Sequence, residues 1–327
     1  MRSIRVWFVA AVIAVIISGG ALIVTGINAI SEGSAAASLA ADRATPPAAS
    51  VTPAASATAT PPAAAPPPSV PPAPAGAAAQ EPAAAGWPDN VTALDAALRK
   101  LAGNTPDFSV AVLDRKTGHT YAYRGSVKFD TASIVKTQIL ACMLLKAQDA
   151  GRAPTSAEMA LAKPMIRLSD NGATTSLYQK LGGKAAVTRS NKRLGLTQTV
   201  VNSRWGLTRT TAADQVRLLA ALVDPKGPLN ASSRQTAFSL MNTVDKAQDW
   251  GVPSVAKAGE ITMVKNGWDT RTADGGLWAV NTIGRVTSKD GAVDVSVVVL
   301  SHNNKSMQSG ITLVEKAAKL TRQHLRY

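Results

Sequence analysis

The sequence has few of the residues that build disulfide scaffolds and metal sites. Its single cysteine in 327 residues, Cys142, excludes a disulfide framework and a lipid anchor on a cysteine after the N-terminal apolar run. The three histidines, His119, His302 and His324, are scattered and have no metal-ligand spacing. There is no Gly-X-Y period, which excludes collagen. We therefore expect no metal and no cofactor.

Acidic residues are also scarce. The chain has 21 Asp and Glu against 35 Lys and Arg, a formal net charge of +14. The basic residues are spread along residues 87–327 rather than gathered into blocks with interleaved aromatic residues, which argues against nucleic-acid binding. A basic surface of this kind favours contact with an anionic cell wall or membrane.

The first thirty residues predict a membrane segment. Arg2 and Arg5 precede an uncharged run over residues 6–30, which is long enough to cross a bilayer. An uncleaved anchor and a signal peptide cleaved after Ala40 both fit this run. In either case we expect the rest of the chain to be extracytoplasmic, either membrane-anchored or secreted.

Two regions follow the membrane segment of residues 1–30. Residues 31–86 are rich in Ala and Pro, carry four charged residues and show no apolar periodicity, which predicts a disordered linker. Residues 87–327 are enough for one large domain with its own core.

The pattern of this domain predicts an α/β fold. We expect an antiparallel sheet of sequence-distant strands, flanked by terminal helices, with a mostly helical subdomain inserted in the middle. The predicted helices cover residues 90–102, 133–150 and 307–325, with further helical segments over 157–222, and the predicted strands cover 108–114, 119–124, 276–285 and 293–302.

One pair of residues is suited to nucleophilic catalysis. Ser133 stands near the predicted start of the helix over 133–150, and Lys136 follows one turn later on the same face. A helix N-terminus favours negative charge on the serine oxygen, and burial or a neighbouring cation allows a lysine to lose its proton and act as a base. By itself, the pair is equally explained by a helix cap and a surface lysine.

Two later triplets strengthen the catalytic interpretation. Ser169-Asp170-Asn171 opens a helical segment and Lys265-Asn266-Gly267 precedes a strand-forming region. Alone, they are explained by a helix cap and a turn. Together with the first pair, their order along the chain is that of the penicillin-recognising serine enzymes, whose third motif is usually Lys-Thr-Gly.

On these motifs, residues 90–327 resemble the class A β-lactamase and penicillin-binding-protein superfamily. The segments Lys265–Trp268 and Gly284–Val286 are also similar to a group of actinobacterial secreted β-lactamase-like serine hydrolases. The resemblance implies a three-layer fold of the β-lactamase/transpeptidase type.

The resemblance also implies roles for the first two motifs. Ser133 would be the acylated nucleophile, Lys136 its base, and Ser169 the relay of a proton to the leaving nitrogen. Asn171 would bind the acyl side-chain amide, and Asp170 would be structural.

The third motif would bind the substrate. Lys265 would bind its carboxylate and lower the pKa of Lys136 by repulsion between like charges. Asn266, Gly267 and Trp268 would also belong to the substrate-binding residues, and the main-chain N–H groups of Ser133 and Trp268 would form the oxyanion hole.

The sequence departs from the family pattern in two places. Asn266 replaces a Thr or Ser whose hydroxyl contacts the substrate carboxylate, and its amide is still able to donate. The Glu that activates the deacylating water is missing, because no Asp or Glu lies between Asp170 and Asp214, and Trp205 stands about where that Glu would be. We therefore expect slow deacylation.

Two functions stay open at this point. The first is a serine acyl-enzyme hydrolase acting on β-lactams or on the D-Ala-D-Ala-like amide bonds of peptidoglycan stem peptides. The second is a catalytically degenerate module on the same fold that binds cell-wall peptides or a partner without turnover.

Overall fold

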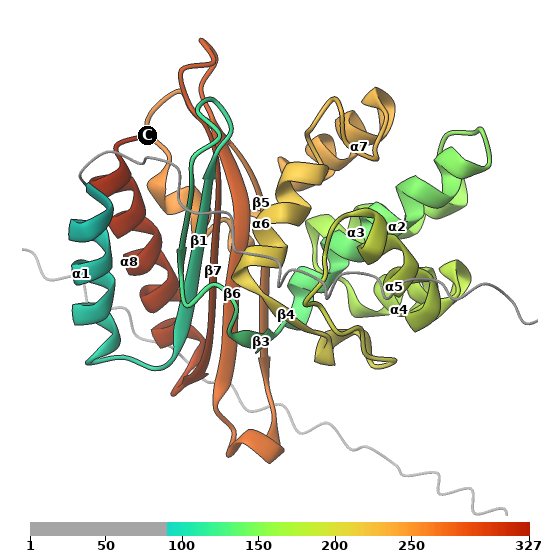
Figure 1. The fold of residues 1–327 in the computed structure, drawn as a ribbon. Coiled ribbons are helices and arrows are strands. Elements are labelled where there is room, and N and C mark those ends of the chain that lie inside the picture. Colours follow the sequence, from blue (N-terminus) through green and yellow to red (C-terminus); the bar gives the residue numbers. More distant parts are fainter. Residues whose placement is uncertain (1–89) are drawn as a thin grey trace, which may run out of the picture. The chain divides into compact units, whose positions relative to one another are not determined.

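The computed structural model describes residues 90–327 (Figure 1). The predicted membrane segment over 1–30 and the predicted linker over 31–86 lie outside the described residues. Within residues 90–327, none of the helices combines the length and the apolar character that a membrane span requires.

A five-stranded antiparallel sheet is at the centre, with the strand order β2-β1-β7-β6-β5. Strand β1 comes early in the described chain and pairs along its whole length with β7 near the C-terminus, which confirms a sheet built from sequence-distant segments. The strands are β1 (Phe108–Asp114), β2 (Thr120–Tyr123), β5 (Ile261–Thr270), β6 (Trp278–Thr287) and β7 (Asp294–Asn304), and a separate pair joins β3 (Lys128–Asp130) to β4 (Arg209–Thr211).

Both faces of the sheet are covered. Helices α1 (Asn90–Ala102) and α8 (Met307–Leu325) lie together against one face, as the sequence predicts for the terminal helices (Figure 1). Because strand side chains alternate, Val297 and Val299 of β7 pack on this side, whereas Val298 packs in the core on the other side. The result is three layers with a buried apolar interface on each side of the sheet.

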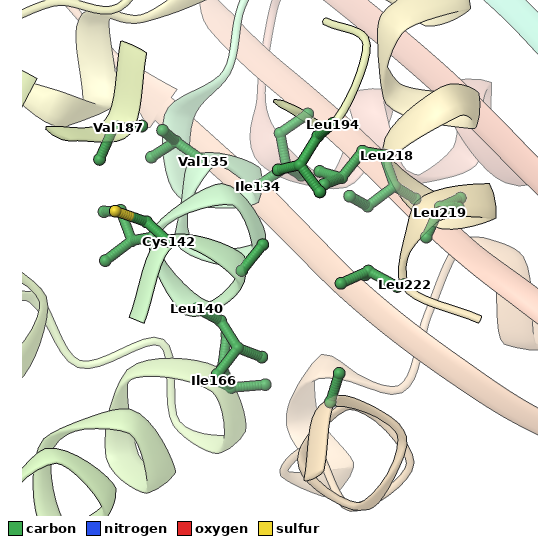
Figure 2. Close-up of a cluster of buried hydrophobic side chains, with 14 of the residues drawn as sticks. Ile134, Val135, Leu140, Cys142, Ile166, Val187, Leu194, Leu218, Leu219 and Leu222 are labelled. Carbon is green, nitrogen blue, oxygen red and sulfur yellow. The ribbon is translucent and has the colours of Figure 1, made fainter. Parts of the chain in front are cut away.

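The second face is covered by the helical part of the molecule, with α2 (Val135–Asp149) at its centre. All residues from 135 to 145 are buried, the polar Lys136, Thr137 and Gln138 among them, so this part of the helix is covered on all sides. Figure 2 shows side chains of α2, Cys142 among them, surrounded by side chains of the neighbouring segments. The other helices are α3 (Ser156–Arg167), α4 (Asn171–Leu181), α5 (Gly183–Arg193), α6 (Ala212–Ala221) and α7 (Ala231–Met241).

The sequence pattern missed β3, β4, β5 and α7. In particular, Lys265-Asn266-Gly267 lies inside β5 rather than in a turn before a strand, with Lys265 opposite Ile283 and Gly267 opposite Asn281. Asn and Gly have low strand preference, so this strand depends on its pairing with β6 rather than on local propensity.

Candidate active site

Ser133 lies in a short 3-10 turn, η1 (Ala132–Ile134), that runs directly into α2. Ala132 has a φ of +44°, in the left-handed region that costs an L-residue about 1–2 kcal/mol. The turn is therefore held by its surroundings rather than by its own preference. The start of α2 places the positive end of the helix dipole close to the half-buried Ser133 side chain.

Lys136 is fully buried and brings the first two motifs together. Its Nζ donates to the main-chain oxygen of Ser169 at 2.6 Å, to Ser169 Oγ at 3.0 Å and to Asn171 Oδ1 at 2.8 Å. Burial lowers the pKa of Lys136 to about 8, and the nearby Asp170 carboxylate opposes that shift. A useful fraction of neutral amine is thus present near neutral pH.

Ser169 lies between α3 and α4 with a φ of +57°, unusual for a residue with a side chain. Its Oγ accepts from Lys136 Nζ and from Lys265 Nζ, both at 3.0 Å. Asp170 caps α4, its Oδ1 accepting from the main-chain N–H of Ala173 at 2.6 Å. The second motif therefore places one hydroxyl between two amines and uses its carboxylate for the helix start.

Lys265 reaches the site from β5 and is also fully buried. Its Nζ donates to Ser169 Oγ and to the main-chain oxygen of Asn266 at 2.8 Å. Burial, and then the Lys136 cation, hold the pKa of Lys265 well below its ordinary value. Because repulsion between two cations is mutual, the pair disfavours the state in which both amines are protonated.

Strand β5 is one of the two edge strands of the sheet and lies directly against the Ser133 turn. A Cβ built on Gly267 would stand 2.7 Å from the Ile134 nitrogen and 2.8 Å from the Ser133 nitrogen, both main-chain atoms. Only glycine fits at this contact. It brings the N–H group of Ser133 beside the strand on which Trp268 is the next residue, as an oxyanion hole from these two groups requires.

Asn266 departs from the expected substrate contact. Its side chain is 1% exposed, and its Nδ2 donates to the main-chain oxygens of Gln248 and Trp250, both at 2.8 Å. Neighbouring side chains of a strand point to opposite faces, so Asn266 faces away from the side on which Lys265 meets Ser169. Its amide ties β5 to the preceding segment and is not available to a substrate carboxylate.

Trp205, in the short helix η2 (Trp205–Leu207), occupies the space beside Lys136. The centroid of its ring lies 4.9 Å from Lys136 Nζ, and its Nε1 donates to Thr175 Oγ1 at 3.2 Å. An aromatic face at this distance stabilises the ammonium form of the lysine by a cation–π interaction. The next carboxylate along the chain, Asp214, is fully buried and accepts from Thr199 and Arg217.

The fold places Asn281 at the site, although no sequence pattern indicates this residue. Asn281, on β6 opposite Gly267, donates to the main-chain oxygens of Asp130 and Thr131, which directly precede the Ser133 turn. It belongs to no motif, and only the pairing of β5 with β6 reveals its position.

Comparison with known proteins identifies the family and the fold. Residues 155–325, about half of the chain, match the model of the Beta-lactamase enzyme family. The chain belongs to this family. "Putative lipoprotein LppW" of Mycobacterium tuberculosis is 33% identical over 199 residues, which cover 57% of this chain and 63% of that protein.

Solved structures of the same superfamily share the fold. A variant of the last common ancestor of Gram-negative class A β-lactamases has a TM-score of 0.62 at 21% identity, covering 71% of this chain and 97% of that one. PBP-A has a TM-score of 0.62 at 18% identity, covering 72% of this chain and 96% of that one. The three-layer β-lactamase fold expected from the motifs is thereby confirmed.

Proposed function

We propose that this member of the Beta-lactamase enzyme family is an extracytoplasmic serine acyl-enzyme hydrolase that acts on β-lactams or D-Ala-D-Ala-like amide bonds. The observation that carries the proposal is the convergence of Lys136 Nζ and Lys265 Nζ on Ser169 Oγ, one helical turn from Ser133. These contacts support the assignment of Ser133 as the nucleophile, Lys136 as its base and Ser169 as the proton relay.

In the proposed acylation, neutral Lys136 takes the proton of the Ser133 hydroxyl as its oxygen attacks the carbonyl carbon of the amide. The main-chain N–H groups of Ser133 and Trp268 stabilise the resulting oxyanion. The carbon–nitrogen bond then breaks, and the leaving nitrogen receives a proton from Ser169 Oγ, which recovers one from Lys136. Asn171 and Lys265 bind the acyl amide and the substrate carboxylate.

Deacylation is proposed to be slow because the site offers no carboxylate as general base for the attacking water. Asp170 caps α4, and Asp214 is buried among its own hydrogen-bond donors. Trp205 covers Lys136 with an aromatic ring that cannot accept a proton. The acyl-enzyme is therefore expected to outlive the acylation step.

The substrate class and location rest on supporting observations. The fold is shared with PBP-A as well as with β-lactamases, and the basic composition suits an anionic cell wall. The relative's lipoprotein name agrees with an extracytoplasmic place. Since the only cysteine here is Cys142, membrane attachment would depend on residues 6–30.

The test is the intact mass of the full chain over time with excess benzylpenicillin. We expect a persistent adduct on Ser133 and none in the Ser133→Ala variant. Labelling of that variant would contradict the role of Ser133, and accumulation of hydrolysed drug with only a transient adduct would contradict slow deacylation.

A binding module without turnover is the competing function, and one observation favours it. Lys136 Nζ donates three hydrogen bonds, the full number that its ammonium form allows, which suits a lysine that serves as a structural donor. Lys136→Ala separates the two functions: a pure binder keeps its affinity for a stem-peptide analogue and never forms an adduct, whereas the enzyme loses adduct formation through this substitution.

A further inference from the structure

The side chain of Asn281 is fully buried on β6 and forms hydrogen bonds through both its amide NH₂ group and its amide oxygen. Its Nδ2 donates to the main-chain oxygen of Asp130 at 2.9 Å and to that of Thr131 at 3.2 Å. Its Oδ1 accepts from the main-chain N–H of Ser301 at 3.0 Å. One side chain therefore connects β7 to the segment just before the Ser133 turn.

The orientation of this amide is fixed by the sheet. The β6–β7 ladder is irregular between Trp278 and Val280, and the N–H group of Ser301 bonds to the Asn281 side chain there. A flipped amide would place its NH₂ group against that N–H and its oxygen against two carbonyls. A single orientation thus satisfies all three partners, as a buried polar group requires.

The segment that Asn281 holds needs external support. Ala132 has its left-handed φ immediately after Thr131, and the turn carries the candidate nucleophile. On the side of β5, Gly267 leaves no space between the strand and the turn. Since Asn281 is the cross-strand partner of Gly267, the two residues act on the turn from adjacent strands.

We propose that Asn281 is a positioning residue, which fixes the Ser133 turn against β5 and thereby sets the separation of the Ser133 and Trp268 N–H groups. The consequence for rate rests on the proposed acyl-enzyme function, whereas the positioning of the turn does not. A displacement of about 1 Å at a reacting group lowers rates up to roughly 100-fold.

The variant Asn281→Asp tests this role, because it keeps the acceptor for Ser301 and removes both donors to the turn. Asn281→Ser is the second variant, should the first fail to fold. The matched control is Asn304→Asp. Asn304 is also fully buried and donates to Trp278 and Ser301, and none of its bonds reaches the segment 130–134.

Two readouts are measured on the full chain, alongside thermal unfolding. Hydrogen–deuterium exchange of residues 130–134 reports how firmly the turn is held, and it does not depend on acylation. Intact-mass kinetics with benzylpenicillin separate the acylation rate constant from the apparent dissociation constant. We expect faster exchange in the Asn281 variants. Their acylation rate constant should be roughly 10- to 100-fold lower, with little change in the dissociation constant. The control should show neither the faster exchange nor the lower rate constant.

Equal exchange in the wild type and a folded Asn281 variant would overturn the proposal, as would equal effects in the Asn304 control. If the wild type forms no adduct, the proposed function fails, while the exchange comparison still decides whether Asn281 positions the turn. Faster exchange with unchanged acylation kinetics would also overturn the role in the reaction.

Discussion

Two sets of buried or nearly buried cations differ in the charge of their hydrogen-bond partners. Arg322 of α8 is 10% exposed and pairs with Glu260, 7% exposed, at 2.6 Å. Lys136 and Lys265 are fully buried, and each hydrogen bond that they donate ends on an uncharged oxygen. The guanidinium has a counter-ion, whereas the two amines share one hydroxyl.

The difference separates a structural ion pair from the lysine pair of the proposed acylation site. When one partner of a buried ion pair is removed, the other is left as an unpaired buried charge, at a high cost in free energy. Amines buried without a carboxylate have lowered pKa values, as those of Lys136 and Lys265 are. The lowered pKa values suit the proposed role of Lys136 as a base, whereas the Arg322–Glu260 pair holds α8 to the segment before β5.

Removal of the amine should have the largest effect on chemistry. Lys136→Met keeps the volume of the side chain and loses the base, so we expect an acylation rate constant roughly 10³-fold lower. Intact-mass kinetics with benzylpenicillin measure it. A variant that acylates at the wild-type rate would show that another group deprotonates Ser133.

Removal of the guanidinium should affect stability alone. Arg322→Met leaves Glu260 buried without its counter-ion, which is expected to cost about 3–5 kcal/mol of unfolding free energy. Urea unfolding measures the loss, and the acylation rate per folded molecule should not change. Replacing Glu260 by Leu in the same chain should restore part of the stability, and no recovery would contradict the pairing argument.

A carboxylate added beside the lysine should change the second half of the reaction. Trp205→Glu introduces a general base in place of the aromatic ring, and we expect the adduct to hydrolyse at least 10-fold faster, a modest part of what such a base can supply. Trp205→Gln is the control, since it opens the same space without a base. Equal lifetimes of the two adducts would show that the bulk of the Trp205 ring, rather than a missing base, limits deacylation.

The sequence predicted the fold well where side-chain periodicity was strong. The helices over 90–102 and 307–325 and the strand over 108–114 have the predicted bounds. It failed at β5, because Asn266 and Gly267 have poor strand preference and are held by long-range pairing.

The motifs predicted which residues meet, since Lys136 and Lys265 both donate to Ser169 Oγ. The direction of Asn266 and the role of Asn281 depend on strand register across β5, β6 and β7. No local pattern encodes that register.

The measurement that tests the central claim most directly is the pH dependence of the acylation rate constant of the full chain. With a pKa of about 8 for Lys136, the rate should rise about tenfold per pH unit below that value and level off above it, because the neutral amine is the active form. A midpoint near the ordinary lysine value of about 10.4 would contradict the role of Lys136 as the base.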